Sequence, residues 1–233
     1  MFQGKCKALT FSFDDGVEQD KRMIEILNRY GMKGTFNLNS GLFGRENDWE
    51  SPNGIVTRKV LQPYELEERY RGHEVAVHTL THPNLTECSD EEVIRQVEED
   101  RKNLEKLVGY DVVGMAYPCG GVNHDERVEK LIQKHTKIKY VRTITSTYSF
   151  EPQDDLYCFN PTAYQYREMD QLFELGERLL KSDEKKTQIF YVWGHCYELD
   201  ANDSWGEFER FCKMMSGKDD IFYGTNREVL LSK

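Results

Sequence analysis

The 233-residue sequence predicts an α/β fold, a distorted (β/α) barrel of seven or eight parallel strands. Two observations support this prediction. Short apolar runs rich in β-branched and aromatic residues alternate along the chain with longer segments of helical periodicity, as in consecutive βα units. About eight such runs occur, and the chain is slightly short for a regular eight-stranded barrel, so we expect some units to be degraded.

The expected strands are apolar runs bounded by polar or turn residues. In chain order they cover residues 7–13, 33–38, 74–78, 112–117, 138–143, 156–159, 188–193 and 220–223. The sixth and eighth runs carry the weakest strand patterns.

The expected helices lie between these runs. They cover residues near 18–30, 63–71, 89–108, 124–136, 166–182, 204–216 and 226–232. Ser89, with Glu92 three residues later, forms the pattern of a capping box, and Thr225 can cap the last helix. Gly31 and Gly109 suit the ends of helices.

Two connections are longer than the few residues that usually join a strand to a helix. They cover residues 39–62 and 144–155, and connections of this length commonly carry function. The chain contains no internal repeat, low-complexity tract or linker. We therefore expect residues 1–233 to form a single domain.

Composition narrows the classes of partner and location. The chain has 31 Lys and Arg against 41 Asp and Glu, a net charge of −10, which argues against nucleic acids and anionic membranes as partners. No apolar run is long enough for a membrane span or a leader peptide, so we expect a cytoplasmic protein. A chain from which a leader had been cut would look the same. Six widely spaced cysteines without a CxxC pair predict reduced, partly buried thiols.

Polar residues gather where the predicted strands end. Asp14 and Asp15 end the first strand, His78 ends the third with His82 four residues later, and His195 follows the seventh. In a parallel barrel the carboxyl ends of all strands open onto the face that carries the active site. We therefore expect these five side chains to converge there.

Each of these patterns also has an ordinary explanation. Two aspartates before Gly16 are more often a turn signal, and two histidines four residues apart occur by chance in many chains. Pro83 disfavours helix at His82, so the two rings of that pair are expected on a loop. The other histidines, His73, His124 and His135, are expected at the surface or behind the site, with His124 on the same face.

Four segments resemble motifs of the polysaccharide deacetylases, the NodB-homology domains of carbohydrate esterase family 4. Residues 10–16 (TFSFDDG) resemble the first motif, TFDDG, with one variation before the second Phe, and residues 78–82 (HTLTH) match H[ST]xxH. Residues 116–120 (AYPCG) resemble the third motif, RxPxG, and residues 192–195 (VWGH) resemble the fifth, LxxH. The motifs occur in the family's order.

The resemblance implies a NodB-like fold and a divalent metal ion held by Asp15, His78 and His82. It also implies Asp14 as the general base and His195 as the general acid, on opposite sides of the ion. One carboxylate and two imidazoles leave positions open for water and substrate, as in catalytic rather than structural metal sites. Zinc is the most favoured ion, with cobalt, nickel or iron as alternatives.

The resemblance further implies hydrolysis of N-acetyl groups, with O-acetyl groups as a second possibility. The tetrahedral oxyanion that forms during hydrolysis would be stabilised by the metal and by the backbone N–H of Cys119. Sugars stack on aromatic rings, so we expect Trp49 and Trp193 to form walls of the site, together with Tyr117 and Pro118 of the third motif. The implied partner is an acetylated oligosaccharide or polysaccharide.

The chain departs from the family pattern at two points. The arginine of the third motif, which pairs with the base aspartate in the family, is Ala116 here, and Arg142 is our hypothesis for its replacement. The fourth motif, with an Asp that tunes the general acid, is not recognisable. Glu198 or Asp200 could orient the imidazole of His195 instead.

These departures keep two other functions open. A carbohydrate-binding relative with weakened catalysis would explain the missing arginine and the missing fourth motif, although binding alone needs neither Asp14 nor His195. A non-haem Fe(II) oxygenase also uses two histidines and one carboxylate, but it usually has a β-rich scaffold. The alternating βα pattern argues against the oxygenase.

Overall fold

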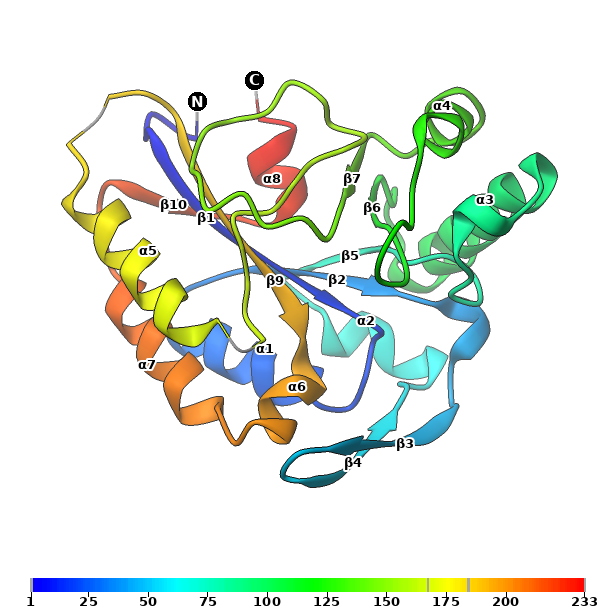
Figure 1. The fold of residues 1–233 in the computed structure, drawn as a ribbon, viewed down its shortest axis with the longest axis horizontal. Helices are drawn as coiled ribbons and strands as arrows, with labels where there is room; N and C mark the ends of the chain where they lie inside the picture. Colours follow the sequence, from blue (N-terminus) through cyan, green and yellow to red (C-terminus); the bar gives the residue numbers. More distant parts are fainter. Residues whose placement is uncertain (1, 167, 184, 233) are drawn as a thin grey trace.

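The structure is a computed structural model that describes residues 2–166, 168–183 and 185–232. Its main sheet is an eight-stranded parallel sheet, curled as in a distorted (β/α) barrel (Figure 1). The strands are β1 (Lys7–Asp14), β2 (Gly34–Leu38), β5 (Glu74–Val77), β6 (Gly114–Ala116), β7 (Tyr140–Arg142), β8 (Ala163–Tyr164), β9 (Gln188–His195) and β10 (Ile221–Tyr223). Their order is β7-β6-β5-β2-β1-β9-β8, and β10 pairs with the start of β1. The predicted fold class is confirmed.

Helices follow the strands, and most of them cover the outside of the sheet, whereas α8 lies on the inner face, where Asn226 donates to Thr10 (Figure 1). They are α1 (Asp20–Arg29), α2 (Leu66–Arg69), α3 (Asp90–Val108), α4 (Glu126–His135), α5 (Met169–Lys181), α6 (Cys196–Ala201), α7 (Trp205–Met215) and α8 (Asn226–Leu230). Short 3-10 turns lie at η1 (Ser40–Leu42), η2 (Pro63–Glu65) and η3 (Leu85–Glu87).

The predicted helix ends are largely confirmed. The Ser89 side chain accepts a hydrogen bond from the Glu92 backbone N–H at the start of α3, and Gly109 ends that helix in the left-handed conformation. Thr225 forms a complete capping box at the start of α8. These contacts satisfy backbone groups that have no partner inside the helix.

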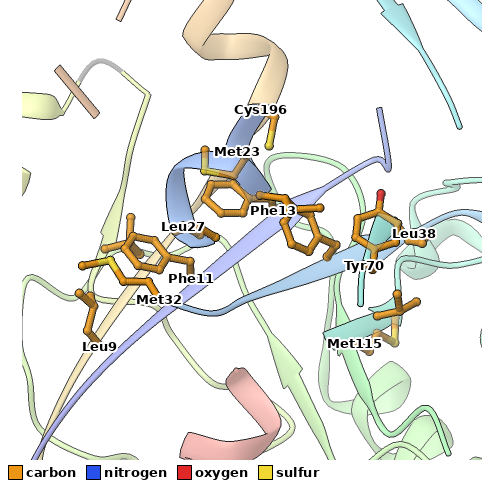
Figure 2. Packing of buried hydrophobic residues seen from close by; sticks show 14 of the residues in the cluster. Leu9, Phe11, Phe13, Met23, Leu27, Met32, Leu38, Tyr70, Met115 and Cys196 are labelled. Atoms are coloured by element: carbon orange, nitrogen blue, oxygen red, sulfur yellow. The ribbon is translucent and has the colours of Figure 1, made fainter. Parts of the chain in front are cut away.

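Alternation along β1 separates an apolar face from a polar one, because successive side chains of a strand point to opposite faces. Leu9, Phe11 and Phe13 belong to the main apolar core with residues of α1 and α7 (Figure 2). The intervening Thr10 and Ser12 accept hydrogen bonds from buried asparagine side chains on the inner face. Asp14 follows Thr10 and Ser12 in the same alternation, so its side chain also points to the inner face. The carboxylate of Asp14 therefore lies on the inner face at the carboxyl end of β1.

The register of the sheet brings the ends of several strands to one level. Asp14 of β1 is paired with Asn37 of β2 on one side and with His195 of β9 on the other. Ala116 of β6 is likewise paired with Arg142 of β7. The convergence of strand ends predicted from the sequence is therefore present.

The sixth predicted strand, residues 156–159, was misplaced. Phe159 forms only an isolated bridge to Arg142, and the paired strand is β8, at residues 163–164. The backbone N–H groups of Tyr157 and Cys158 donate to the side chain of Asp155. These two N–H groups are therefore not free to form the backbone hydrogen bonds of a strand. The segment nevertheless lies beside β7, because Leu156 and Phe159 form backbone hydrogen bonds with Val141.

The long connection at residues 39–62 contains a hairpin that the sequence analysis did not predict. Strands β3 (Glu46–Ser51) and β4 (Gly54–Lys59) pair antiparallel and project from the barrel (Figure 1). Asn53 followed by Gly54 is a recognised hairpin signal, flanked here by exposed rather than buried residues. The hairpin contacts α6, a short helix that was also not predicted.

The composition-based expectations can be compared with the structure in two respects. All six cysteines are free, with Cys196 and Cys212 buried and the others half-buried, as predicted. None of the helices in the described part of the chain combines the length and apolar character needed to cross a membrane.

Candidate active site

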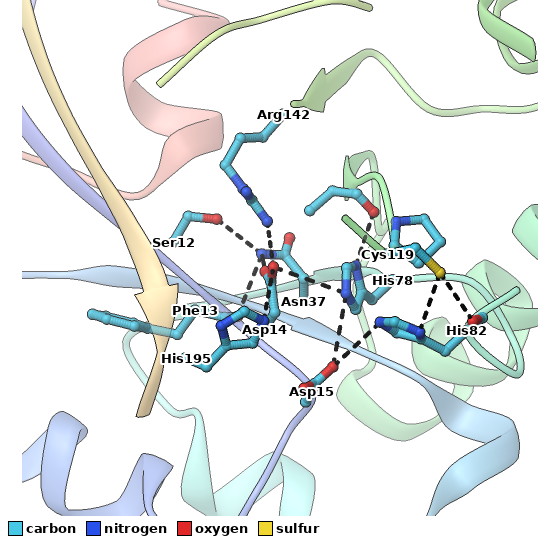
Figure 3. A network of polar contacts seen from close by, with 12 residues as sticks. Ser12, Phe13, Asp14, Asp15, Asn37, His78, His82, Cys119, Arg142 and His195 are labelled. Carbon is cyan, nitrogen blue, oxygen red and sulfur yellow. Dashed lines mark hydrogen bonds and ion pairs between the residues drawn. The ribbon is translucent and has the colours of Figure 1, made fainter. Parts of the chain in front are cut away.

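Five polar side chains from separate parts of the chain meet at the carboxyl ends of β1, β5 and β9 (Figure 3). Asp14 and Asp15 come from the end of β1, and His195 comes from the end of β9. His78 directly follows β5, and His82 lies four residues further along the same loop. The sequence-predicted residues are thus brought together.

Asp15, His78 and His82 form a cluster of possible metal ligands. Asp15 Oδ1 lies 3.8 Å from His78 Nε2 and 3.7 Å from His82 Nε2. A tetrahedral ion with ligand bonds of about 2.0 Å needs ligand atoms about 3.3 Å apart, so a small inward movement would complete the geometry. The donor set and its spacing therefore fit a divalent ion.

Hydrogen bonds fix the orientation of the His78 ring. Its Nδ1 donates to the carbonyl of Ala116 at 2.9 Å, which leaves the lone pair of Nε2 directed toward Asp15. Burial lowers the pKa of His78 to about 4, so the ring is neutral near pH 7. His82 is less buried, and its Nδ1 lies 3.7 Å from the Cys119 thiol.

The loops that carry the cluster have unusual backbone conformations. Asp15, Thr79, His82 and Cys119 all have positive φ, between 63° and 80°, a region that residues other than glycine rarely adopt. Such conformations cost of order 1–3 kcal/mol each and concentrate at functional sites. They persist here because local hydrogen bonds hold the loop, such as the His82 N–H donating to Thr79 Oγ1.

Buried polar residues behind the cluster support the His78 loop. Asp100 of α3 accepts hydrogen bonds from the backbone N–H groups of Ser40 and His78. The Asn39 side-chain amide donates to the carbonyls of His78 and Thr79. Neither Asp100 nor Asn39 was identified from the sequence, because a single acid in a helix and a single amide after a strand carry no distinctive pattern.

Asp14 is 2% exposed and lies beside this cluster. Its Oδ1 accepts a 2.8 Å hydrogen bond from the Asn37 side chain, and its Oδ2 pairs with the Arg142 guanidinium. Burial alone would raise the pKa of this carboxyl, but the guanidinium and the neighbouring imidazoles hold the pKa below its usual value. Asp14 is therefore an ionised carboxylate with one edge directed toward His78, 3.8 Å away.

Arg142 lies at the end of β7, beside Asp14. This is the position required by the hypothesis that Arg142 replaces the missing arginine of the third motif. Arg142 is 1% exposed, and its guanidinium stacks over the Trp193 ring at 4.2 Å. A second donor of the same group bonds to the carbonyl of Thr143. Ala116 of β6 is paired with Arg142 of β7. An arginine at either of these two positions would therefore have its Cα in a similar place relative to Asp14.

His195 is held by the acidic residue three positions further along the chain. Its Nδ1 lies 3.1 Å from Glu198 Oε1, and Glu198 also accepts a hydrogen bond from Tyr164. Burial alone would lower the pKa of His195, but Glu198, with smaller contributions from Asp15 and Asp14, raises it to about 9. Near neutral pH the imidazole is therefore protonated.

Of the two acids considered as partners for His195, Glu198 is in contact and Asp200 is not. Asp200 instead accepts a hydrogen bond from Trp205 Nε1. His195 Nε2 lies 4.0 Å from Asp14 Oδ2, so these two groups are neighbours, whereas the sequence analysis predicts opposite sides of the ion. The register explains this, because Asp14 and His195 are directly paired across β1 and β9.

A cavity of about 420 Å³ opens over these groups. Both aspartates and the three clustered histidines line it, with Tyr164 and Tyr197 at its sides. Of the predicted wall residues, Tyr117 and Trp193 line the cavity, but Pro118 and Trp49 are not among the lining residues. Trp49 packs against the ring of Tyr197 at 5.5 Å, one layer behind the wall.

Cys119 lies at the rim of the cavity with its backbone N–H available. No hydrogen bond to that N–H occurs within the described residues, whereas the Cys119 carbonyl accepts from the Asn123 side chain. Its positive φ of 69° turns the peptide away from the extended path of β6. A free N–H beside the ligand cluster can donate to an oxyanion.

The remaining histidines lie outside the cavity wall. His135 is exposed, and His124 stacks on Tyr117 behind the wall, where its Nε2 lies 3.5 Å from the Cys158 thiol. His73 was expected at the surface or behind the site, and this prediction was wrong, because His73 is buried beside the amino end of β2, where it accepts a hydrogen bond from the Gly34 N–H. His124, Glu129 and Cys158 also form a second group of possible metal ligands.

Comparison with known proteins identifies related sequences. A family model described as polysaccharide deacetylase matches residues 3–141. The peptidoglycan-N-acetylglucosamine deacetylase PgdA of Listeria monocytogenes is 33% identical over 119 residues, which are 50% of this chain and 22% of the relative. The peptidoglycan-N-acetylmuramic acid deacetylase PdaC of Bacillus subtilis is 36% identical over 124 residues, 52% of this chain and 23% of the relative. The chain spans less than a quarter of the length of either relative.

Solved structures with the same fold include the Xyl-CE4 domain of a multidomain xylanase from the hindgut metagenome of Trinervitermes trinervoides. It superposes with a TM-score of 0.60 over 97% of this chain and 90% of that domain, at 17% identity. At this level of identity the likeness demonstrates the shared fold alone.

Proposed function

Since this chain belongs to the polysaccharide deacetylase family, we propose that it hydrolyses acetyl groups from acetylated sugars, with residues 1–233 acting as one catalytic domain. The first candidate substrate is an N-acetylated oligosaccharide or polysaccharide, with O-acetyl groups as the second. One observation supports this most strongly. An ionised Asp14 and a protonated His195 lie 4.0 Å apart, beside three possible metal ligands.

The proposed metal ligands are Asp15 Oδ1, His78 Nε2 and His82 Nε2. Zinc is the most favoured ion for one carboxylate and two imidazoles, and cobalt, nickel or iron are alternatives. A bound ion would supply Lewis acidity, which polarises an acyl carbonyl and lowers the pKa of water from 15.7 toward about 7.

Asp14 is the proposed general base. The Arg142 guanidinium and the Asn37 amide keep this carboxylate ionised and fix its orientation, so that it can accept the proton of the attacking water. The environment of Asp14 favours the role of general base over that of metal ligand, because Asp14 Oδ2 accepts a hydrogen bond from Arg142.

Cys119 and His195 are proposed to act on the tetrahedral intermediate that the attack produces. The backbone N–H of Cys119 would donate to the oxyanion of the tetrahedral intermediate. The amine of the sugar is too basic to leave as an anion, so it takes a proton from His195, which Glu198 keeps charged and oriented. Acetate and the free amine then leave.

The two alternative functions lose their support. The binding-only relative was suggested by the missing arginine of the third motif and by the missing fourth motif. Arg142 supplies a guanidinium at Asp14, and Glu198 supplies a carboxylate at His195. The Fe(II) oxygenase usually has a β-rich scaffold, whereas this chain has an α/β fold. A deacetylase is the function that uses both Asp14 and His195.

The proposal is tested by measuring acetate release after reconstitution of the protein with zinc, cobalt or nickel. The panel should include N-acetylated glucosamine oligosaccharides, peptidoglycan fragments and acetylated xylan, which separate N-deacetylation from O-deacetylation. We expect acetate from at least one acetamido substrate. Failure to release acetate from any of them, with each metal, would contradict the proposal.

A further inference from the structure

A second cavity adjoins the active-site cavity beneath the hairpin. It has a volume of about 320 Å³, and it shares Asp15, Arg58 and His82 with the larger cavity. Arg45, directly before β3, and Asn47 of β3 also line it. A molecule that contacts the ligand cluster can therefore extend into this second cavity, which we call the hairpin lobe.

Arg58 of β4 lies at the junction of the two cavities and lacks an acidic partner. Its guanidinium stacks over the Tyr197 ring at 5.1 Å, and one nitrogen reaches the Tyr197 hydroxyl at 3.5 Å. Its buried Nε has no hydrogen-bond partner. No carboxylate pairs with Arg58 among the residues that the structure describes, in contrast to Lys59 beside it, which pairs with Glu18. A buried donor without an acceptor is costly, and a ligand can supply that acceptor.

Arg45 adds a second positive charge to the lining of the lobe. Its backbone is fixed by hydrogen bonds with Leu42 and Val60, so the residue stays beside β4. Its side chain is exposed and pairs with no carboxylate in the described ranges. Two unpaired arginines in one lobe contrast with the net charge of −10 for the whole chain.

The only carboxylate among the lobe's lining residues is Asp15, which is a proposed metal ligand. The remaining lining is apolar or carries amide, hydroxyl and imidazole groups. The lining residues of the lobe thus carry two arginines against one carboxylate, a balance of charge that favours an anion.

We propose that the hairpin lobe binds a carboxylate on the substrate, held by Arg58 with the help of Arg45. This inference rests on the proposed deacetylase function and names the substrate class more closely, as an acetamido sugar with a carboxylate on the same or the adjacent ring. Arginine matches the planar, two-oxygen geometry of a carboxylate. Arg58 acts as a specificity-determining residue rather than as part of the chemistry.

The test compares two substrates that differ only in charge. They are a peptidoglycan disaccharide with a free lactyl carboxylate and the same disaccharide with that group converted to a methylamide. We expect the wild-type protein to favour the acid in kcat/KM by roughly tenfold to a hundredfold, the usual range for hydrogen bonds to a charged group. Arg58→Gln should abolish this preference by raising KM for the acid, while Arg58→Lys should retain part of it.

Arg71→Gln is the matched control, because it removes the same charge at an exposed position outside both cavities. Equal kcat/KM for acid and methylamide in the wild type would overturn the inference. So would an Arg58→Gln variant that lowers kcat equally for both, since this would indicate that Arg58 only supports Tyr197, whose hydroxyl donates a hydrogen bond to Asp15. Melting temperatures of the variants identify any general loss of folding.

Equilibrium binding separates this inference from the proposed function. The same two compounds are titrated into wild-type protein and into Arg58→Gln, each carrying Asp14→Asn to prevent turnover. Preferential binding of the acid that depends on Arg58 would support the lobe even if no acetate were ever released. Turnover without any charge preference would support the deacetylase and refute the lobe.

Discussion

Arg142 and Asp14 form a buried ion pair, with Nη2 and Oδ2 2.5 Å apart, across 128 residues of sequence. The pair joins the ends of β7 and β1, and both side chains are almost completely excluded from solvent. The family places its arginine on the third motif, where this chain has Ala116. In this chain the positive charge beside the aspartate therefore comes from Arg142 of β7 and not from the third motif.

Replacing Arg142 with alanine should lower kcat/KM by at least about a hundredfold, because the proposed base would lose the cation that keeps it ionised and oriented. It should also lower the free energy of unfolding by about 3–5 kcal/mol, since a buried charge would lose its partner. Metal content, measured by elemental analysis, should stay unchanged. Arg210→Ala, which removes an exposed ion pair with Glu207, is the control and should change stability by less than about 1 kcal/mol. Unaltered turnover in Arg142→Ala would refute the replacement hypothesis.

The same pair allows a rescue experiment. Ala116 is the neighbour of Arg142 across β6 and β7, so Ala116→Arg in the Arg142→Ala background inserts the guanidinium from the adjacent strand. We expect this double variant to recover part of the lost activity, because the volume vacated at position 142 can accommodate the new side chain. Initial rates of acetate release measure the recovery. A double variant as inactive as Arg142→Ala, although folded, would indicate that the strand of origin matters.

The pH dependence of activity should report on His195 and Glu198. A general acid works only when protonated, and the pKa of His195 is raised to about 9, so kcat/KM should remain high through neutral pH and fall as pH rises through that range. Glu198→Gln removes the carboxylate that raises the pKa, so this alkaline decline should move to lower pH. Asp200→Asn is the control, because Asp200 contacts Trp205 instead. A decline at the same pH in wild type and Glu198→Gln would exclude His195 as the titrating acid.

Metal stoichiometry separates the two groups of possible ligands. Asp15→Asn and His78→Ala should each reduce the metal content of the reconstituted protein strongly, because each removes one of three ligands. His124→Asn, which alters the second group with Glu129 and Cys158, should leave the content unchanged. If only His124→Asn lowered the metal content, the assignment of the ion to Asp15, His78 and His82 would be wrong.

Much of this site could be predicted because its residues lie at the ends of apolar strands. Asp14, His78 and His195 each follow a run whose burial is evident from composition, and parallel strands place such ends on one face. Arg142 was found by the same reasoning, since it lies at the end of the fifth predicted strand. Hydrophobic patterns are reliable for these elements because both faces of the strands are covered.

The residues that escaped prediction depend on contacts between segments that are distant in sequence. Arg58 lies on a hairpin whose strands are exposed, so no alternation of apolar and polar residues marks them. Strand β8 has only two paired residues, and its position is set by hydrogen bonds to β9 rather than by its own composition. The neighbouring placement of Asp14 and His195 follows from sheet register, which sequence patterns leave undetermined at single-residue level.

The central claim is that Asp14 carries out the proton transfer beside a metal that it does not hold. Metal content and acetate release measured on the same preparation of Asp14→Asn test it most directly, with Asp15→Asn alongside. We expect Asp14→Asn to retain the metal of the wild type and to lose nearly all turnover, and Asp15→Asn to lose both. An Asp14→Asn protein that binds metal and still releases acetate at the wild-type rate would contradict the account.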